Sequence, residues 1–329
     1  MLEIEIDVVK GFESFVLHDI EEFQKQGFEF TSFDDWEKDE IQRTPDLISK
    51  TDIEIQESYN QYLIYEYSNL RQRFIPQKPR TIVYAKDFVR IPEYEKGLQL
   101  LEEKIKKGEG LTPHLSRKIL KANEQDGLLF DFGVYHLHLG EKEDSIHSGL
   151  IEGRKKILYS VFTDDKAFFI CIDDHGRWGD LDLLKIIQKE FPQAIEKWEL
   201  KDVIELSFYP TEKDRLQLRK AGINTPIEIN GKFYMSPGGG INTARTSAQG
   251  VFEMNAYYHF YKTIDNQIKL LLEKHSNDIS KKLKIDGVLK FVMTSINPME
   301  FEDKKHMLKL IPIIKDNNLV GINIGKIDR

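Results

Sequence analysis

The spacing of the apolar residues changes partway through positions 93–192, and this change constrains the fold more than any other feature of the chain. Four apolar residues recur at helical spacing: Tyr94, Leu98, Leu101 and Ile105. Thr112 and Pro113 then fit the cap and first residue of a second helix. Apolar or alternating runs typical of strands follow at 132–139, 157–162 and 167–172. The pattern predicts an α+β unit in which a helical hairpin packs on an antiparallel sheet.

The C-terminal part of the chain predicts a second α+β module that contains one long helix. Capping residues mark two helix starts, at Thr211 and at Thr246–Ser247, and the second helix is the longest in the sequence. Turn residues predict hairpins at Asn230–Gly231, at Asp286–Gly287 and at 315–318. At 329 residues the chain is longer than one typical domain. We therefore expect three parts: an N-terminal part at 1–92, a central unit at 93–200 and a C-terminal module at 201–329.

The charge of the N-terminal part is unevenly distributed. Residues 1–60 carry a net charge of −12, whereas the whole chain carries −8. The acidic run at 34–40 fits a solvated helix face, or a segment that covers basic residues electrostatically. Residues 62–89 contain Pro76 and Pro79, which favour an extended strap or an edge strand.

A stripe of basic residues follows the acidic run. It is made of Arg71, Arg73, Lys78 and Arg80, with Phe74 and Tyr84 interleaved. Cations alternating with aromatic rings can follow a phosphate backbone and stack bases, so the stripe is a candidate nucleic-acid site. The alternative is a set of exposed cations that pair with the acidic segment.

The composition argues against disulfide bonds and against membrane-spanning segments. Cys171 is the single cysteine, which excludes an internal disulfide and a thiolate zinc site. We find no long apolar run and no signal-peptide pattern at the N-terminus, so we expect a cytoplasmic protein without a membrane partner. We also expect no cofactor.

Histidines concentrate in the central unit. His136 and His138 lie in one predicted strand, where alternation places both side chains on the same face. His175 follows the third strand, Arg154 and Lys155 precede the middle one, and Tyr159 lies within it.

Three interpretations of this cluster are open. In metal-independent RNA cleavage, the histidines transfer protons and a cation stabilises the phosphate charge. In a metal-dependent hydrolase, the ligands would be His136, His138, Asp173 and His175, with Asp174 adjacent. In the third interpretation the histidines are structural and pair with carboxylates such as Glu141 and Asp144.

A glycine-rich segment joins a predicted strand to the long helix. Its sequence, SPGGGINTARTS, could bind an anion at the helix start through Gly238, Gly239, Gly240, Thr243, Arg245, Thr246 and Ser247. It matches neither the Walker A nor the dinucleotide-binding pattern. The alternative is a flexible loop with ordinary helix capping.

The central unit resembles the RelE/HigB-like messenger-RNA interferase toxins. The resemblance rests on a helical hairpin followed by HLHLG and by KKILYSVFTDDKAFFICIDDHG, within residues 93–192. It implies that Arg154, Lys155, Lys156 and Tyr159 form a basic ribonuclease strand and that His175 stands at the end of the next one. The toxins are small and basic, whereas this region is acidic, and the His136–His138 pair has no counterpart in their pattern.

The sequence therefore predicts an RNA-binding protein, with metal-independent ribonuclease activity of a toxin or phage-defence type. The alternatives are a non-catalytic scaffold that binds another protein and a metal-dependent hydrolase that uses the His136–His138 strand.

Overall fold

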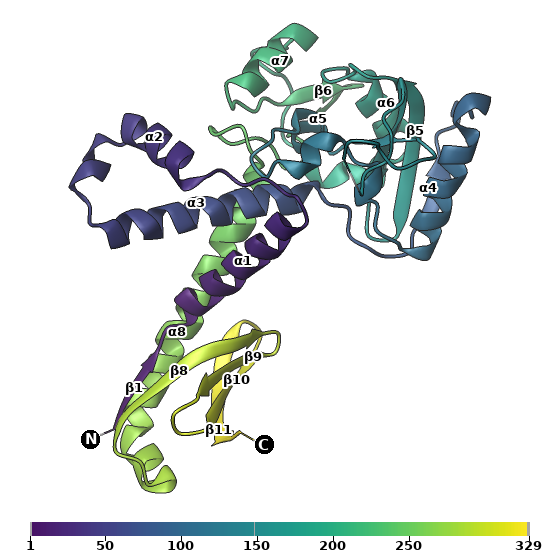
Figure 1. Ribbon diagram of the computed structural model, residues 1–329. Helices are drawn as coiled ribbons and strands as arrows, with labels where there is room; N and C mark the ends of the chain where they lie inside the picture. Colours follow the sequence, from purple (N-terminus) through teal and green to yellow (C-terminus); the bar gives the residue numbers. More distant parts are fainter. Residues whose placement is uncertain (1, 148, 328–329) are drawn as a thin grey trace. The chain divides into compact units, whose positions relative to one another are not determined.

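The computed structural model describes residues 2–147 and 149–327, apart from the side chain of Ile48 (Figure 1). The chain forms two compact units. Unit 1 comprises residues 1–26, 32–65 and 252–329, and unit 2 comprises residues 27–31 and 66–251. The expected boundaries at 92 and 200 do not coincide with this division. The reason is a strand pairing between the two ends of the chain, which the local pattern does not reveal.

Unit 1 contains a five-stranded sheet in the order β1-β8-β9-β10-β11. Strand β1 (Leu2–Ile6) pairs in parallel with β8 (Gly287–Ile296). The other strands are antiparallel: β9 (Met299–Asp303), β10 (Leu308–Lys315) and β11 (Asn318–Lys326). The hairpin predicted at 315–318 is confirmed. The hairpin predicted at Asp286–Gly287 is wrong, because this turn leads from a helix into β8.

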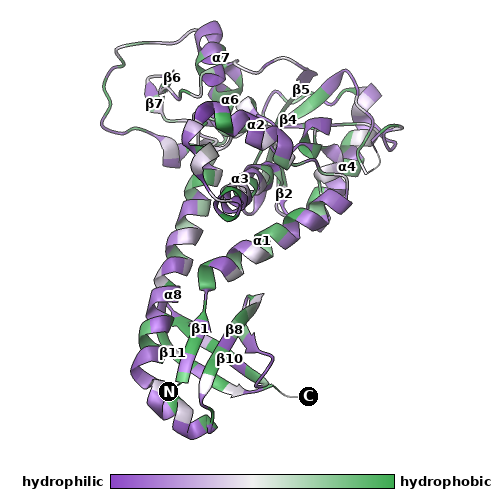
Figure 2. Cartoon of the chain, turned by 60° about the vertical axis from the view of Figure 1, so that its left-hand side comes forward, coloured by the Kyte–Doolittle hydropathy of each residue, from purple (hydrophilic) through white to green (hydrophobic). Residues whose placement is uncertain are grey.

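The helices of unit 1 are amphipathic or capped at their starts. Helix α1 (Val8–Lys25) buries Val8, Phe12, Val16 and Ile20 along one side, and hydrophobic and hydrophilic residues alternate along it in Figure 2. The acidic run forms α2 (Phe33–Arg43), in which Ser32 caps the start and Trp36 is buried. Acidic residues in a first turn are favoured by the helix dipole, so this segment has a structural explanation. A short turn, η1 (Pro45–Ser49), follows.

Two helices contribute residues to both units: α3 (Asp52–Arg73) and α8 (Ala248–Leu283). The long helix predicted after Ser247 is therefore confirmed. The prediction of an extended strap from Tyr62 is wrong as far as Arg73, because this stretch is the second half of α3. Leu63, Ile64 and Leu70 are buried there at helical spacing, and this burial outweighs the strand preference of the neighbouring aromatic residues.

Unit 2 contains a four-stranded sheet in the order β2-β5-β4-β3. Strands β3 (Tyr135–His138), β4 (Lys156–Phe162) and β5 (Lys166–Asp174) are antiparallel, as predicted. The edge strand β2 (Thr81–Tyr84) pairs in parallel with β5. The core on one side of the sheet contains Ile157, Tyr159 and Val161 of β4, which pack with Leu184 and Ile187 of α6 (Asp182–Glu190).

The helical hairpin predicted at the start of the central unit is only half formed. Its first helix is α4 (Glu95–Lys107), which follows the turn η2 (Pro92–Tyr94) and packs against β2. The second predicted helix is wrong. The chain instead forms three short segments: η3 (Thr112–His114), η4 (Arg117–Leu120) and α5 (Gly127–Phe132). Ser116 caps the start of η4 and Asp126 caps the start of α5, so the chain begins a new short segment at each of these residues instead of continuing one helix.

The remaining elements of unit 2 agree with the predicted pattern. The capping box of Thr211 and Asp214 opens α7 (Glu212–Lys220), and Asn230–Gly231 connects β6 (Ile227–Ile229) to β7 (Lys232–Tyr234). Two turns, η5 (Pro192–Ala194) and η6 (Glu196–Trp198), lie between α6 and α7. The chain is thus an α+β protein, as predicted. Among the described residues no helix is long and apolar enough to cross a membrane.

Candidate functional site

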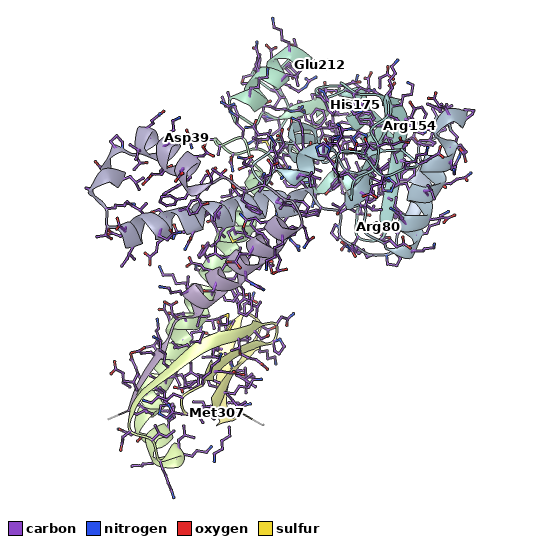
Figure 3. All side chains as sticks on the ribbon, in the orientation of Figure 1. Asp39, Arg80, Arg154, His175, Glu212 and Met307 are labelled. Carbon is purple, nitrogen blue, oxygen red and sulfur yellow. The ribbon has the colours of Figure 1, made fainter. Side chains whose placement is uncertain are left out.

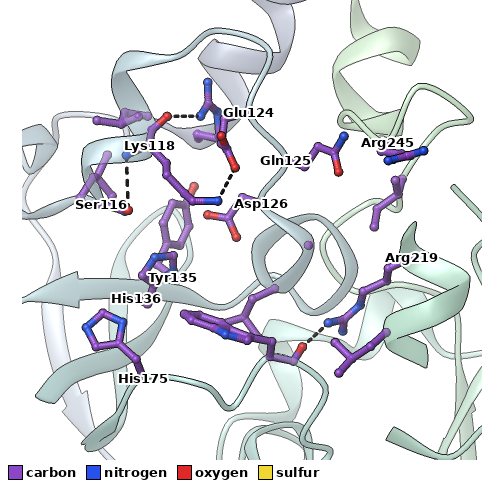
Figure 4. A pocket seen from close by; sticks show the side chains of 18 of the residues that line it. Ser116, Lys118, Glu124, Gln125, Asp126, Tyr135, His136, His175, Arg219 and Arg245 are labelled. Atoms are coloured by element: carbon purple, nitrogen blue, oxygen red, sulfur yellow. Dashed lines mark hydrogen bonds and ion pairs between the residues drawn. The ribbon is translucent and has the colours of Figure 1, made fainter. Parts of the chain in front are cut away.

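Unit 2 encloses a cavity of about 560 Å³ that is lined by side chains from distant parts of the sequence (Figure 4). Strand β3 contributes Tyr135 and His136, and the loop after β5 contributes His175 and Trp178. The other charged lining residues come from α3, η4, α7 and the loops around α5 and α8: Arg73, Lys118, Glu124, Asp126, Arg219, Lys220 and Arg245. The lining therefore contains five cations and two carboxylates, and this excess of positive charge favours an anionic ligand.

The structure brings the three predicted histidines together. His136 and His138 lie opposite Tyr159 and Ile157 of β4 and therefore share one face of the sheet, as predicted. The ring centroid of His138 is 5.5 Å from that of His175. Trp178 joins the group, with its ring centroid 5.3 Å from that of His136 and 6.2 Å from that of His175. His136 and His175 line the cavity, whereas His138 does not.

Burial sets the protonation of the two strand histidines. It lowers the pKa of His136 below its ordinary value and lowers the pKa of His138 to about 4. The Nδ1 atom of each ring is buried and has no hydrogen-bond partner among the described residues. Both imidazoles are therefore neutral at pH 7. His175 is exposed.

A fourth histidine, His114, lies beneath this group and was not predicted. It is completely buried, and its Nδ1–H donates to the carbonyl oxygen of His138 at 2.9 Å. Burial lowers the pKa of His114 to about 4. Its position in a short turn gives no sequence signal, because TPH resembles the first residues of an ordinary helix.

Helix α7 holds the loop that carries His175 and Trp178. Arg215 donates to the carbonyl oxygen of Gly179 at 2.9 Å, and Arg219 donates to that of Trp178. Arg219 also pairs with Asp131 at 2.7 Å. Both arginines are more than nine-tenths buried. Sequence reasoning missed them because α7 is strongly hydrophilic, and its arginines have the spacing of a solvent-exposed face.

Three residues of the predicted catalytic set lie elsewhere. Arg154, which is labelled in Figure 3, contacts Glu141 and Glu152 at 3.7 and 3.5 Å. Lys155 is exposed and pairs with Asp174. Tyr159 is completely buried; its hydroxyl donates to the carbonyl oxygen of Asp174, and burial raises its pKa to about 12. None of the three lines the cavity, so the geometry gives no support to their predicted catalytic role. Tyr159 belongs to the core face of β4.

The glycine-rich segment does not form an anion site at the helix start. A Cβ on Gly238 would lie 1.8 Å from the carbonyl oxygen of Leu129, so this glycine permits close packing of backbone against backbone. The backbone N–H of Ser247 donates to Asn69, and the N–H of Thr246 donates to Asn242. These amides are therefore occupied.

The remaining predicted members of the segment differ in their surroundings. Gly239 and Gly240 have positive φ angles of 92° and 89°, and Thr243 is exposed. Arg245 is the one predicted residue of the segment that lines the cavity.

The basic stripe is not a surface. Arg73 and Arg80 are buried, and their guanidinium groups donate to backbone carbonyl oxygens, including those of Lys121 and Thr163. Lys78 pairs with Asp164 at 2.5 Å, which leaves Arg71 as the exposed cation of the four, with its guanidinium over the ring of Tyr67. The four cations therefore do not form the continuous exposed stripe that was predicted, although Arg73 lines the cavity of unit 2. The guanidinium groups serve as hydrogen-bond donors to loops.

The predicted metal ligands do not form a ligand set. Asp173 is engaged by Lys156 at 3.5 Å and by Arg177 at 3.4 Å. In the part of the chain that the structure describes, no group of three or more His, Cys, Asp or Glu side chains is arranged to hold a metal ion. The geometry therefore gives no support to the metal-dependent alternative with His136, His138 and His175.

No protein-family model, curated protein or solved structure matches the chain, so the interpretation of the site depends on its own geometry.

Proposed function

We propose that the cavity of unit 2 binds single-stranded RNA and that His136 and His175 cleave a phosphodiester bond there without a metal ion. The observation that carries the proposal is the convergence of two imidazoles and an excess of cations on one cavity of about 560 Å³. This volume is typical of a small-ligand site and accommodates a short segment of a strand.

The chemistry requires one neutral and one protonated imidazole. His136 is neutral because burial lowers its pKa, so its Nε2 accepts the proton of the ribose 2′-hydroxyl. The 2′-oxygen attacks phosphorus, the bond from phosphorus to the 5′-oxygen breaks, and protonated His175 donates its proton to that oxygen. The products are a 2′,3′-cyclic phosphate and a 5′-hydroxyl. Cations that line the cavity stabilise the charge on the phosphate oxygens during the attack.

Trp178 provides an aromatic surface for a base. It lines the cavity and is in ring contact with both histidines. Stacking of a base on an aromatic side chain contributes about 1–3 kcal/mol and tolerates any sequence. We therefore expect binding with little base specificity.

The test is cleavage of a labelled single-stranded RNA in the presence of EDTA. His136→Asn and His175→Ala should each lower the cleavage rate by about 10²–10⁴, the usual contribution of a proton-transfer group. His275→Ala, at a half-exposed histidine of unit 1, is the matched control and should cleave like the unchanged protein. Wild-type rates in both cavity variants, or no cleavage by the unchanged protein, would reject the proposed activity.

A second candidate is RNA binding without cleavage. Neither His136 nor His138 has a described partner for Nδ1, whereas catalytic histidines commonly have a group that orients this nitrogen. The same experiment separates the two functions, since a binding protein retards the RNA on a gel but yields no cyclic phosphate. Growth of cells that express the chain adds a second measurement: a toxin-like ribonuclease arrests growth, and a binding protein does not.

A further inference from the structure

The cavity has two chemically different ends (Figure 4). One end presents the imidazoles of His136 and His175, and the opposite end presents Arg219 and Arg245. Lys220 follows Arg219 on α7 and also lines the cavity. The cleavage chemistry described above assigns proton transfer to the imidazole end but gives Arg219, Lys220 and Arg245 no individual role.

The cationic end has more positive charge than its neighbours neutralise. Within the described chain, neither Arg245 nor Lys220 has an ion-pair partner, whereas Lys118 on the opposite side pairs with Glu124 at 2.5 Å. Asp126, the second carboxylate of the lining, accepts the backbone N–H of Leu129 at 3.1 Å. The two carboxylates of the cavity are thus engaged, and the charge of the cationic end is left for a ligand.

Arg219 supplies a buried donor at this end. Its side chain is 8% exposed and is fixed by Asp131 and by the carbonyl oxygen of Trp178. Its Nη2 atom nevertheless has no hydrogen-bond partner in the described chain. A buried guanidinium N–H without an acceptor is costly, and a ligand oxygen that reached it after a small side-chain rotation would remove this cost.

Arg245 is presented from a constrained turn. Its φ angle is +66°, a conformation that residues other than glycine seldom adopt. The turn is closed by the N–H of Arg245, which donates to the carbonyl oxygen of Asn242 at 2.8 Å. The side chain of Asn242 in turn contacts Thr246. Rigid backbone therefore places this guanidinium group at the cavity.

We propose that Arg219, Lys220 and Arg245 form a subsite for a second phosphate group of the RNA strand, next to the phosphate that is cleaved. This inference rests on the proposed function and specifies its substrate as a strand with phosphates on both sides of a nucleoside. Guanidinium groups match the geometry of phosphate oxygens and bind them through paired hydrogen bonds. The nucleoside between the two phosphates lies in the middle of the cavity, where Trp178 is available.

Nucleotide binding tests the subsite independently of cleavage. Adenosine 3′-monophosphate and adenosine 3′,5′-bisphosphate are titrated by calorimetry into the full chain, its Arg245→Gln variant and its Lys220→Gln variant. Loss of a charge-assisted hydrogen bond, about 1.5–3 kcal/mol, corresponds to a Kd raised about 10-fold or more. We expect this loss for the bisphosphate and a change below about threefold for the monophosphate. Lys213→Gln, an exposed residue of α7 outside the cavity, is the control and should bind both as the unchanged protein does.

The outcomes distinguish the subsite from the activity. Equal affinity of the unchanged protein for the two nucleotides, or equal weakening of both by Arg245→Gln, would overturn the subsite even if the histidine variants abolish cleavage. A selective loss of bisphosphate binding would support the subsite even if no RNA is cleaved, and the failure would then belong to the catalytic proposal alone.

Discussion

At the scale of single residues, burial controls the protonation of the histidines His114 and His138. His114 is completely buried, and one ring nitrogen donates to the backbone while Nε2 has no described partner. Protonation would place a charge on that unpartnered nitrogen, so the folded protein keeps His114 neutral. His138 is restrained in the same way by burial and by the neighbouring imidazoles. These two residues make the folded state resist proton uptake.

We therefore expect stability to decrease as pH falls. The pKa of His114 is about 4 in the folded chain and 6.5 without burial, so below pH 6.5 the unfolded state binds a proton that the folded state excludes. The free energy of unfolding should fall as pH drops through 6.5, with a slope for this residue that approaches about 1.4 kcal/mol per pH unit near pH 5. Urea unfolding at pH 7, 6 and 5 measures the slope.

His114→Asn keeps a donor near the Nδ1 position and removes the titration. The variant should lose stability at pH 7 and show a shallower pH slope than the unchanged protein. His18→Asn, at an exposed position of α1, is the control and should leave the slope unchanged. A slope that His114→Asn does not alter would contradict the assignment of this titration to His114.

At the scale of elements, α7 stabilises the loop after β5. Its capping box fixes the start of the helix, and its buried arginines donate to the backbone of Trp178, Gly179 and Pro210. The loop carries two residues of the cavity, so α7 acts on the site through the loop. Arg215 itself does not line the cavity, which makes it a positioning residue.

Replacement of Arg215 tests this role. Arg215→Met removes the donors to the carbonyl oxygens of Gly179 and Pro210, and each buried carbonyl left without a partner costs about 1–3 kcal/mol. We expect reduced stability to urea and a shift of Trp178 fluorescence emission to longer wavelength as the loop opens to water. Lys213→Met, at an exposed position two residues before Arg215 on the same helix, should change neither. An unchanged emission spectrum in Arg215→Met would show that the loop is held without Arg215.

At the scale of the whole molecule, a strand near the N-terminus pairs with a strand in the C-terminal part of the chain. Residues 2–6 form the edge strand of the sheet in unit 1 and pair in parallel with residues 287–291. Leu2 and Ile6 are buried there. Unit 1 is therefore assembled only after the last part of the chain is available, whereas the sheet of unit 2 is formed by residues 81–174.

Removal of residues 2–6 should affect one sheet and spare the other. Loss of β1 leaves one edge of β8 without hydrogen bonds, so its amides should exchange with deuterium faster, by at least about tenfold. The amides of β4 and β5 should keep their protection. Glu3→Gln with Glu5→Gln retains the strand and is the control, because both side chains are exposed. Unchanged exchange in β8 after the deletion would argue against the parallel pairing.

The sequence alone determined the elements whose signals are local. The α+β class, the three antiparallel strands, the capping box at Thr211, the hairpin at Asn230–Gly231 and the long helix after Ser247 all depend on residues a few positions apart. The sequence also indicated the group of His136, His138 and His175. Alternation along β3 places His136 and His138 on one face, and His175 begins the loop after β5.

Tertiary structure alone decided which charged residues face a ligand. Arg73, Arg80, Arg215 and Arg219 have the sequence signals of surface cations, but all four are buried and donate hydrogen bonds to backbone carbonyl oxygens inside the fold. Tyr159 and His114 are buried by neighbours far along the chain, and β1 finds its partner about 280 residues away. Charge and side-chain type are visible in a sequence, whereas burial and the partner of each donor depend on which distant segments pack together.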